Sequence, residues 1–317
     1  MKSPFMERRA TATIAVIMAI TMISGGAIII LTDSSESDGR PIIYTSMNWQ
    51  KEMVQEIVGE DYAVHSFIGA GKDPHTYEGT VTDAARIERA SAYFYIGAGT
   101  AWEDRYVDVA ADNGVNSYDC FHGADIEPYL GGCAHEDHDH AGGAEAVDLH
   151  VWTSPWNLTA MAGYVRDVMK NIDPARADEF DAGYDRYFDG EGGTKALELL
   201  ATEKLKALAE EKAVEGEELM LVVWHGSWGY LLRDCGIDQH SIEGLTDSTF
   251  GPIIGLEELN YGEPFKIFVG TEAERSNASK AAPNCETVLV NPLSGNWLDA
   301  LGDAIEKISE GLIEGEH

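Results

Sequence analysis

The sequence predicts an α/β protein with two lobes. From Pro41 onward, short apolar runs rich in β-branched residues alternate with amphipathic stretches, a pattern typical of βα units and mostly parallel sheets. A charged, helix-favouring stretch over residues 174–212 contains no strand candidate and separates two groups of apolar runs. With 317 residues, the chain has the length of about two domains. We therefore predict an N-terminal lobe over residues 41–172, a connecting helical region over 173–214 and a C-terminal lobe over 215–317.

Apolar runs mark the strands of each lobe. They cover residues 42–46, 62–68, 92–96 and 115–118 in the first lobe, and 219–224, 266–269 and 287–290 in the second. Helices are indicated by an apolar stripe over residues 48–58 and by capping signals at residues 80–83 and 154–155. A closing helix is expected over residues 296–313. Both halves of the chain therefore combine strands with helices.

A charge-free apolar run covers residues 10–31 and follows basic residues that include Arg8 and Arg9. The run has about the length needed to cross a bilayer, and basic residues before it keep the amino terminus in the cytoplasm. The polar, acidic stretch over residues 32–40 reads as a flexible tether to an extracytoplasmic body. Residues 1–40 are thus expected to form a membrane anchor, or a signal that is cleaved on secretion, followed by the tether.

Acidic residues dominate the charge of the chain. There are 22 Lys and Arg residues against 55 Asp and Glu residues, which gives a formal net charge of −33 at pH 7. Such a charge repels phosphate backbones and raises the local concentration of cations. We therefore expect no nucleic acid partner, and we expect the chain to act as a monomer.

The four cysteines follow the apolar segment, in a compartment where disulfides persist. Of the three possible pairings, the one that joins Cys120 to Cys133 and Cys235 to Cys285 keeps each bond within one lobe, and it is the pairing we predict. The alternative is four unpaired, buried thiols. No Cys-x-x-Cys pattern occurs, so the sequence does not indicate a thiolate zinc cluster.

A His-rich tract lies inside a stretch rich in Gly and Ala, residues 131–143. It reads HEDHDH and contributes His135, His138 and His140. Imidazoles and carboxylates at this density bind divalent transition metals, but a flexible tract imposes no fixed geometry. We interpret the tract as an accessory metal-binding loop; the alternative is a solvated acidic loop.

Three further histidines each lie beside the end of a predicted strand. His75 is part of GKDPHTYE, His150 of DLHVW and His225 of VVWHGSWGY. Ligands of α/β sheets bind beyond the carboxyl ends of the strands. In addition, Pro74 restricts the residue before it to extended backbone, which helps to fix the position of His75. These histidines are therefore the candidate metal ligands.

With these motifs, residues from about Pro41 to Ile313 resemble the metal-receptor proteins of ABC importers, the ZnuA-like and TroA-like solute-binding family. The three His motifs occur in the order found in the family, and the acidic His-rich loop precedes the second of them, as in zinc-receiving members. The resemblance implies two Rossmann-like lobes joined by one long helix, with the metal in the cleft between the lobes. It also implies that His75, His150 and His225 are the ligands.

The chain departs from the family pattern at two places. Manganese- and iron-type members have an Asp before a Pro-Leu turn, whereas this chain has Asn291 before Pro292. Three imidazoles and an open position remain, and water, Glu78 or Asn291 is expected to fill that position. The second departure is the Gly-rich stretch at residues 190–193, which we expect to interrupt the connecting helix.

Three neutral nitrogen ligands favour zinc over manganese. The sequence thus predicts an extracytoplasmic zinc receptor that delivers Zn²⁺ to an ABC permease and performs no chemical step. Three alternatives remain: a manganese or iron receptor of the same family, a surface adhesin, and an anchored zinc hydrolase. The hydrolase would need a general base beside a metal-bound water, and Glu78 is its candidate because the His-Glu-x-x-His pattern is absent.

Overall fold

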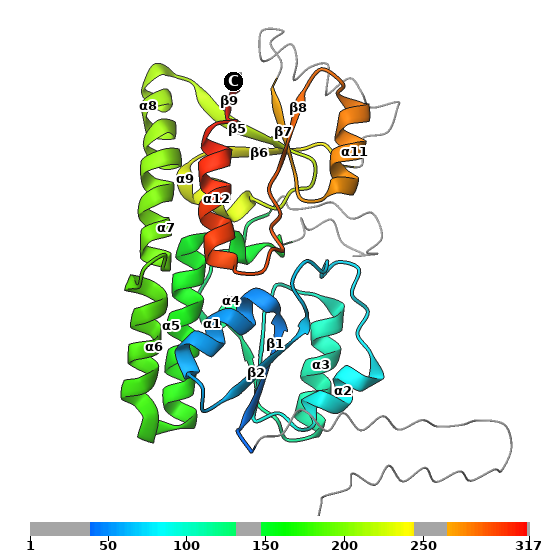
Figure 1. The fold of residues 1–317 in the computed structure, drawn as a ribbon, viewed down its shortest axis with the longest axis vertical. Helices are drawn as coiled ribbons and strands as arrows, with labels where there is room; N and C mark the ends of the chain where they lie inside the picture. The colour runs from blue at the N-terminus through cyan, green and yellow to red at the C-terminus, as the bar shows by residue number, and fades with distance from the viewer. Residues whose placement is uncertain (1–38, 131–146, 244–264, 316–317) are drawn as a thin grey trace, which may run out of the picture. The chain divides into compact units, whose positions relative to one another are not determined.

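The N-terminal lobe is built on a four-stranded parallel sheet (Figure 1). The computed structural model describes residues 39–130, 147–243 and 265–315, and residues 40–317 form one compact unit. The strands are β1 (Ile42–Met47), β2 (Ala63–Ile68), β3 (Ala92–Tyr95) and β4 (Ser117–Asp119), in the order β2-β1-β3-β4. The helices are α1 (Asn48–Val58), α2 (Val81–Ile87), α3 (Ala101–Asp112), α4 (Cys120–Gly123) and α5 (Pro155–Ile172), with a 3₁₀ turn at Val151–Thr153. The parallel α/β class predicted from the sequence is confirmed.

The C-terminal lobe contains a second parallel sheet with one antiparallel strand added. Its strands are β5 (Glu218–Val223), β6 (Asp238–Ser241), β7 (Lys266–Val269), β8 (Glu286–Leu289) and β9 (Ile313–Gly315). The parallel order is β6-β5-β7-β8, and β9 pairs antiparallel with β5. The helices of this lobe are α9 (Gly229–Cys235), α11 (Glu272–Ala281) and α12 (Trp297–Ser309). Strands β6 and β9 are not among the predicted strands, because they are short and contain few apolar residues.

The helical connection between the sheets is not one continuous helix. After a 3₁₀ turn at Pro174–Arg176 it consists of α6 (Ala177–Asp189), α7 (Thr194–Ala201), a π-helical turn at Thr202–Lys206 and α8 (Ala207–Glu215). These pieces follow one another along one side of the unit (Figure 1). The expected interruption falls between Asp189 and Thr194. A side chain at Gly190 would place its Cβ 2.3 Å from the carbonyl oxygen of Arg186, so the break needs glycine there.

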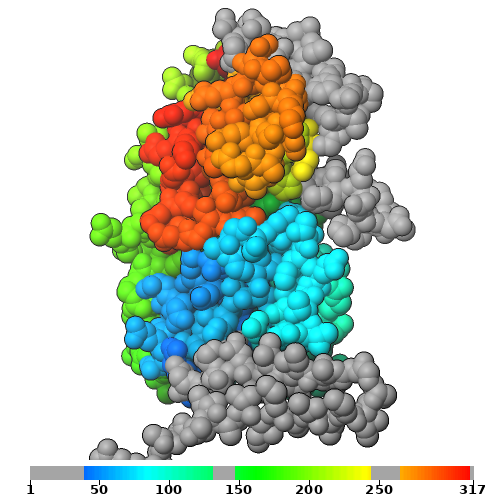
Figure 2. Space-filling view, turned by 45° about the vertical axis from the view of Figure 1, so that its right-hand side comes forward, coloured from blue at the N-terminus to red at the C-terminus, as the bar shows by residue number. Residues whose placement is uncertain are grey.

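A single large apolar cluster extends through both lobes. It contains residues of the N-terminal sheet and of α1, such as Ile43 and Met53, together with Trp228 and Leu301 of the C-terminal lobe. Successive residues of a strand face opposite sides of the sheet. Accordingly, the alternate residue Val222 of β5 belongs to a second, smaller cluster on the other face of the C-terminal sheet. The shared cluster fixes the two lobes against each other, and Figure 2 shows them in contact along one face.

The predicted disulfide between Cys235 and Cys285 is wrong. Cys235 is a free thiol, buried in the large cluster, with its sulfur 4.0 Å from the carbonyl oxygen of Ala201. Cys285 packs instead against the small cluster. The two cysteines therefore belong to different apolar clusters. The prediction relied on their position in the same lobe, and that position does not show which cluster each of them joins. Burial also raises the pKa of the Cys235 thiol to about 12.

The second predicted disulfide and the predicted membrane segment involve residues that are not described. Cys120 is a free, buried thiol, and its predicted partner Cys133 lies outside the described residues. The apolar run over residues 10–31 lies outside them as well. Within the described ranges, no helix has both the length and the apolar character needed to cross a bilayer.

Close packing of α6 on α1 yields a stability prediction. A Cβ added to Gly183 of α6 would lie 2.3 Å from the carbonyl oxygen of Ile57 and 2.7 Å from that of Glu56. We expect Gly183→Ala to lower the free energy of unfolding by about 1–3 kcal/mol, because the helices must move apart. Denaturant unfolding measures the change.

The matched control is Gly163→Ala in α5. A Cβ at Gly163 would meet only the ring of Tyr184, at an ordinary contact distance of 3.8 Å. Since alanine favours helix over glycine by about 1 kcal/mol, this variant should be as stable as the parent or more stable. Equal effects of the two substitutions would contradict the packing account.

Candidate metal centre

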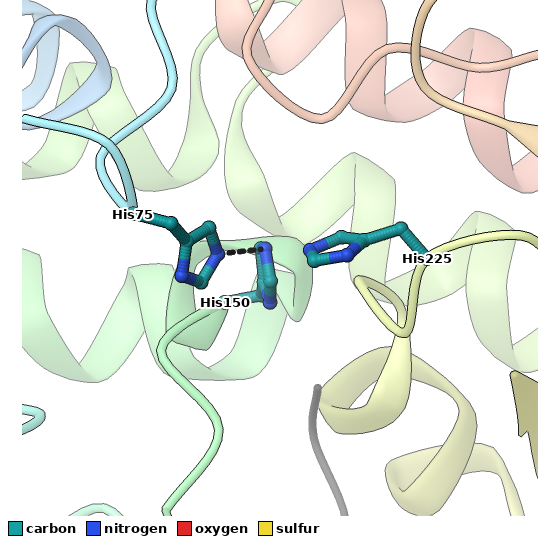
Figure 3. A group of neighbouring side chains, drawn as sticks. All are labelled: His75, His150 and His225. Carbon is teal, nitrogen blue, oxygen red and sulfur yellow. Dashed lines mark hydrogen bonds between the residues drawn. The ribbon is translucent and has the colours of Figure 1, made fainter. Parts of the chain in front are cut away.

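Three histidines that are far apart in the sequence meet between the two lobes (Figure 3). His75 lies in the loop between β2 and α2, His150 precedes the 3₁₀ turn before α5, and His225 follows β5. One ring nitrogen from each lies within 4.8 Å of the others. The Nε2 atoms of His75 and His150 are 3.3 Å apart. The three ring centroids are separated by 5.1 to 5.3 Å. These are the three ligands predicted from the sequence, and the structure brings all of them together.

Hydrogen bonds of its loop hold His75 in place. The backbone N–H of His75 donates to the carboxylate of Asp73 at 2.8 Å. Pro74, between them, is buried. Gly71, at the start of the same loop, donates its N–H to the carbonyl oxygen of Leu293 in the C-terminal lobe at 2.7 Å. The loop that carries His75 is therefore fixed at Gly71 and again at His75 itself.

A buried carboxylate orients His150. Oδ1 of Asp148 accepts hydrogen bonds from the backbone N–H of His150 at 2.9 Å and from its Nδ1 at 2.7 Å. Both residues are 2% exposed. With the proton held on Nδ1, the lone pair of Nε2 faces the other two rings, which is the arrangement of carboxylate–histidine–metal triads. The second carboxylate oxygen, Oδ2, is buried and has no hydrogen-bond partner among the described residues.

His225 has a carboxylate partner that sequence analysis missed. Its Nδ1 is hydrogen-bonded to Oε2 of Glu243 at 2.5 Å, which again leaves Nε2 for the centre. Glu243 lies two residues beyond β6, and its backbone N–H donates to the carbonyl oxygen of Trp224 at 2.8 Å. The role of Glu243 depends on the pairing of β6 with β5. No strand was predicted there, so the sequence contained no signal that would place Glu243 beside His225.

The histidines line a small cavity of about 120 Å³. Its walls also contain Asp73, Pro74, Ser227, Glu243, Gly270, Thr271, Glu274, Asn291, Pro292 and Leu293. A cavity of this size holds an ion with a few waters. The carboxylates in and behind its walls favour a cation over an anion.

The two residues predicted as a possible fourth ligand differ in their position relative to the cavity. Asn291 lines the cavity, and its Oδ1 accepts a hydrogen bond from the backbone N–H of Leu293 at 2.8 Å. Glu78 is exposed and is not part of the cavity wall. Among the described residues, no carboxylate joins the three histidines at ligand spacing. Glu274 lines the cavity, but one of its oxygens already accepts the N–H of Gly270 at 2.7 Å.

The accessory loop residues His135, His138 and His140 lie outside the described residues.

The fold and the cluster define a two-lobed α/β protein with three convergent imidazoles, a donor set suited to a divalent transition metal. The sequence profile of one family, described as zinc-uptake complex component A, periplasmic, matches residues 43–310. The chain belongs to this family of solute-binding receptors.

Similar proteins agree with this membership. The zinc-binding lipoprotein AdcA of Streptococcus pneumoniae is 27% identical over 278 residues, which cover 83% of this chain and 52% of AdcA. The zinc-binding protein AdcA of Streptococcus pyogenes is 25% identical over 224 residues, covering 66% of this chain and 41% of that protein. The chain thus spans about half the length of these relatives.

Solved structures show the same fold. The crystal structure of Zn(II)-bound AdcA from Streptococcus pneumoniae superposes with a TM-score of 0.68 at 21% identity, over 86% of this chain and 58% of that one. A Mn-bound periplasmic metal-binding protein from Candidatus Liberibacter asiaticus gives a TM-score of 0.64 at 19% identity, over 86% and 99% of the two chains. The fold alone therefore does not distinguish zinc from manganese.

The contact between Glu243 and His225 yields a prediction about metal affinity. Replacing a carboxylate that orients a ligand imidazole typically weakens metal binding 10- to 100-fold. We expect Glu243→Gln to raise the Kd for zinc by about that factor, measured by competition with a chelator of known affinity.

Glu272→Gln is the control for this substitution, because Glu272 is an exposed residue of the same lobe that pairs with Arg275. It removes the same charge from the chain and should leave the Kd unchanged. An equal loss of affinity in both variants would mean that net charge matters and that the contact with His225 does not.

Proposed function

We propose that the protein is an extracytoplasmic receptor that binds Zn²⁺ through His75, His150 and His225 and delivers it to the permease of an ABC importer. The observation that carries the proposal is the convergence of three ring nitrogens from both lobes within 4.8 Å. Membership of the zinc-uptake family supports the same function. The ion is the cargo, and the receptor carries out no reaction on it.

The donor set favours zinc as the cargo. Zinc prefers four-coordinate sites with imidazole ligands, whereas manganese prefers octahedral sites rich in carboxylate and water oxygens. Here three imidazoles converge, and Asn291 stands where manganese- and iron-type members have an Asp. Water or Asn291 completes the shell, and Glu78, which is exposed outside the cavity, is not proposed as a ligand.

A receptor accounts for the site better than a hydrolase does. A zinc hydrolase needs a general base within reach of the metal-bound water. Glu78, the only base proposed from the sequence, does not line the cavity. Glu243 and Asp148 are hydrogen-bonded to the outward nitrogens of two of the rings, where they orient ligands.

The proposed function also includes the location of the receptor and the way in which it collects zinc. Residues 1–40 attach the receptor to the cell membrane or direct its secretion, which places residues 41–317 outside the cytoplasm. The curated relative in Streptococcus pneumoniae is called a lipoprotein, whereas this chain has no Cys before Cys120. The His-rich loop, with His135, His138 and His140, collects zinc and passes it to the three histidines, and the receptor works as a monomer.

Substitution of the ligands tests the proposal. We expect His75→Ala, His150→Ala and His225→Ala each to weaken zinc binding so far that the ion is lost on dialysis, measured by metal analysis, while a raised Kd stays measurable by titration calorimetry. Zinc should also displace manganese from the parent protein.

His122→Ala is the matched control, since the ring of His122 is largely exposed and pairs only locally with Asp119. This variant should retain the zinc of the parent. If the three ligand variants retain tight zinc as well, the site lies elsewhere. If manganese outcompetes zinc, the receptor carries manganese.

A further inference from the structure

Residues 291–296, in the segment between β8 and α12, belong to the C-terminal lobe but are held by the N-terminal lobe. Pro292 accepts a hydrogen bond at its carbonyl oxygen from Nε1 of Trp152 at 2.8 Å. The carbonyl oxygen of Leu293 accepts one from the N–H of Gly71 at 2.7 Å. Both donors stand next to metal-site histidines in the sequence, since Trp152 follows His150 by two residues and Gly71 begins the loop of His75.

The first turn of α12 is capped from the other lobe. The carboxylate of Glu52, in α1, accepts the backbone N–H of Asn296 at 3.1 Å and that of Trp297 at 3.0 Å, one with each oxygen. Asn296, the N-cap residue, has a φ of 54° and makes no capping hydrogen bond with its own side chain. A carboxylate at a helix N-terminus satisfies free N–H groups and interacts favourably with the helix dipole. Glu52 therefore does for α12 what a local cap usually does.

The same junction contains a further interlobe bond. Nε1 of Trp297 donates to the carbonyl oxygen of Trp152 at 2.9 Å, and both indoles are buried. We call Glu52, Trp152 and residues 291–297 the interlobe clamp. If the lobes separate at this junction, the hydrogen bonds of the clamp break and His225 moves away from His75 and His150.

We propose that Glu52 is a positioning residue for the metal site: by capping α12 across the lobe boundary, it holds the lobes at the spacing at which His225 completes the three-histidine site. The inference rests on the proposed function, because it assumes that the three histidines hold the zinc. Glu52 lines no part of the metal cavity, so it acts through the clamp.

The test compares Glu52→Ala and Glu52→Gln with Glu56→Gln in the full chain. Glu56 lies in the same helix, one turn further on, and pairs with Arg186 at the surface. Loss of a helix cap corresponds to about a tenfold change in an equilibrium constant. We expect Glu52→Ala to raise the Kd for zinc about tenfold, Glu52→Gln to raise it less, and Glu56→Gln to leave it unchanged.

A thermodynamic cycle with His225→Ala separates positioning from simple stabilisation of the fold. Without His225 the two remaining histidine ligands both lie in the N-terminal lobe, so closure contributes less to binding, and adding Glu52→Ala should raise the weakened Kd by a smaller factor than it does in the parent. The inference is overturned if Glu52→Ala binds zinc like the parent, or if it raises the Kd by the same factor with and without His225. If His225→Ala alone leaves zinc binding intact, the proposed function fails, and the clamp proposal fails with it.

Discussion

Three imidazoles from two separate lobes have to meet within a few ångströms, and the rest of the structure depends on this constraint. His75 and His150 belong to the N-terminal lobe and His225 to the other, so any rotation of one lobe against the other alters the site. The apolar cluster that extends through both lobes resists such rotation. So do the hydrogen bonds that join Gly71 and Trp152 to the segment after β8. Contacts between the lobes thus set the distances inside the cavity.

Carboxylates behind the rings fix the orientation of the imidazoles as well. Asp148 and Glu243 each occupy the Nδ1 atom of a histidine, which leaves Nε2 as the ligand atom in both cases. The imidazoles provide the ligand atoms. The negatively charged carboxylates are hydrogen-bonded to the other nitrogen of the rings. This arrangement attracts a cation and offers it nitrogen donors, a combination that suits zinc better than the oxygen-rich shells of manganese sites.

Much of the fold and the three histidines could be predicted from the sequence, because apolar runs identify buried strands and the three His motifs resemble those of the family. The expected position beside a strand end holds only for His225, since His75 lies in a long loop and His150 precedes a 3₁₀ turn. The features that could not be predicted from the sequence depend on tertiary contacts. Strand β6 is short and polar, so Glu243 had no predicted neighbour. Cys235 and Cys285 share a lobe but belong to different cores, a difference set by how the helices pack on the sheet. Glu78 adjoins the first His motif in sequence, yet its side chain lies outside the cavity.

X-ray absorption spectroscopy of the protein loaded with one equivalent of zinc tests the three-imidazole site most directly. The account predicts a first shell dominated by histidine nitrogens at about 2.0–2.1 Å, with the outer-ring scattering of three imidazoles reduced to two in His225→Ala. A shell of oxygens alone, or a spectrum that His225→Ala leaves unchanged, would contradict it.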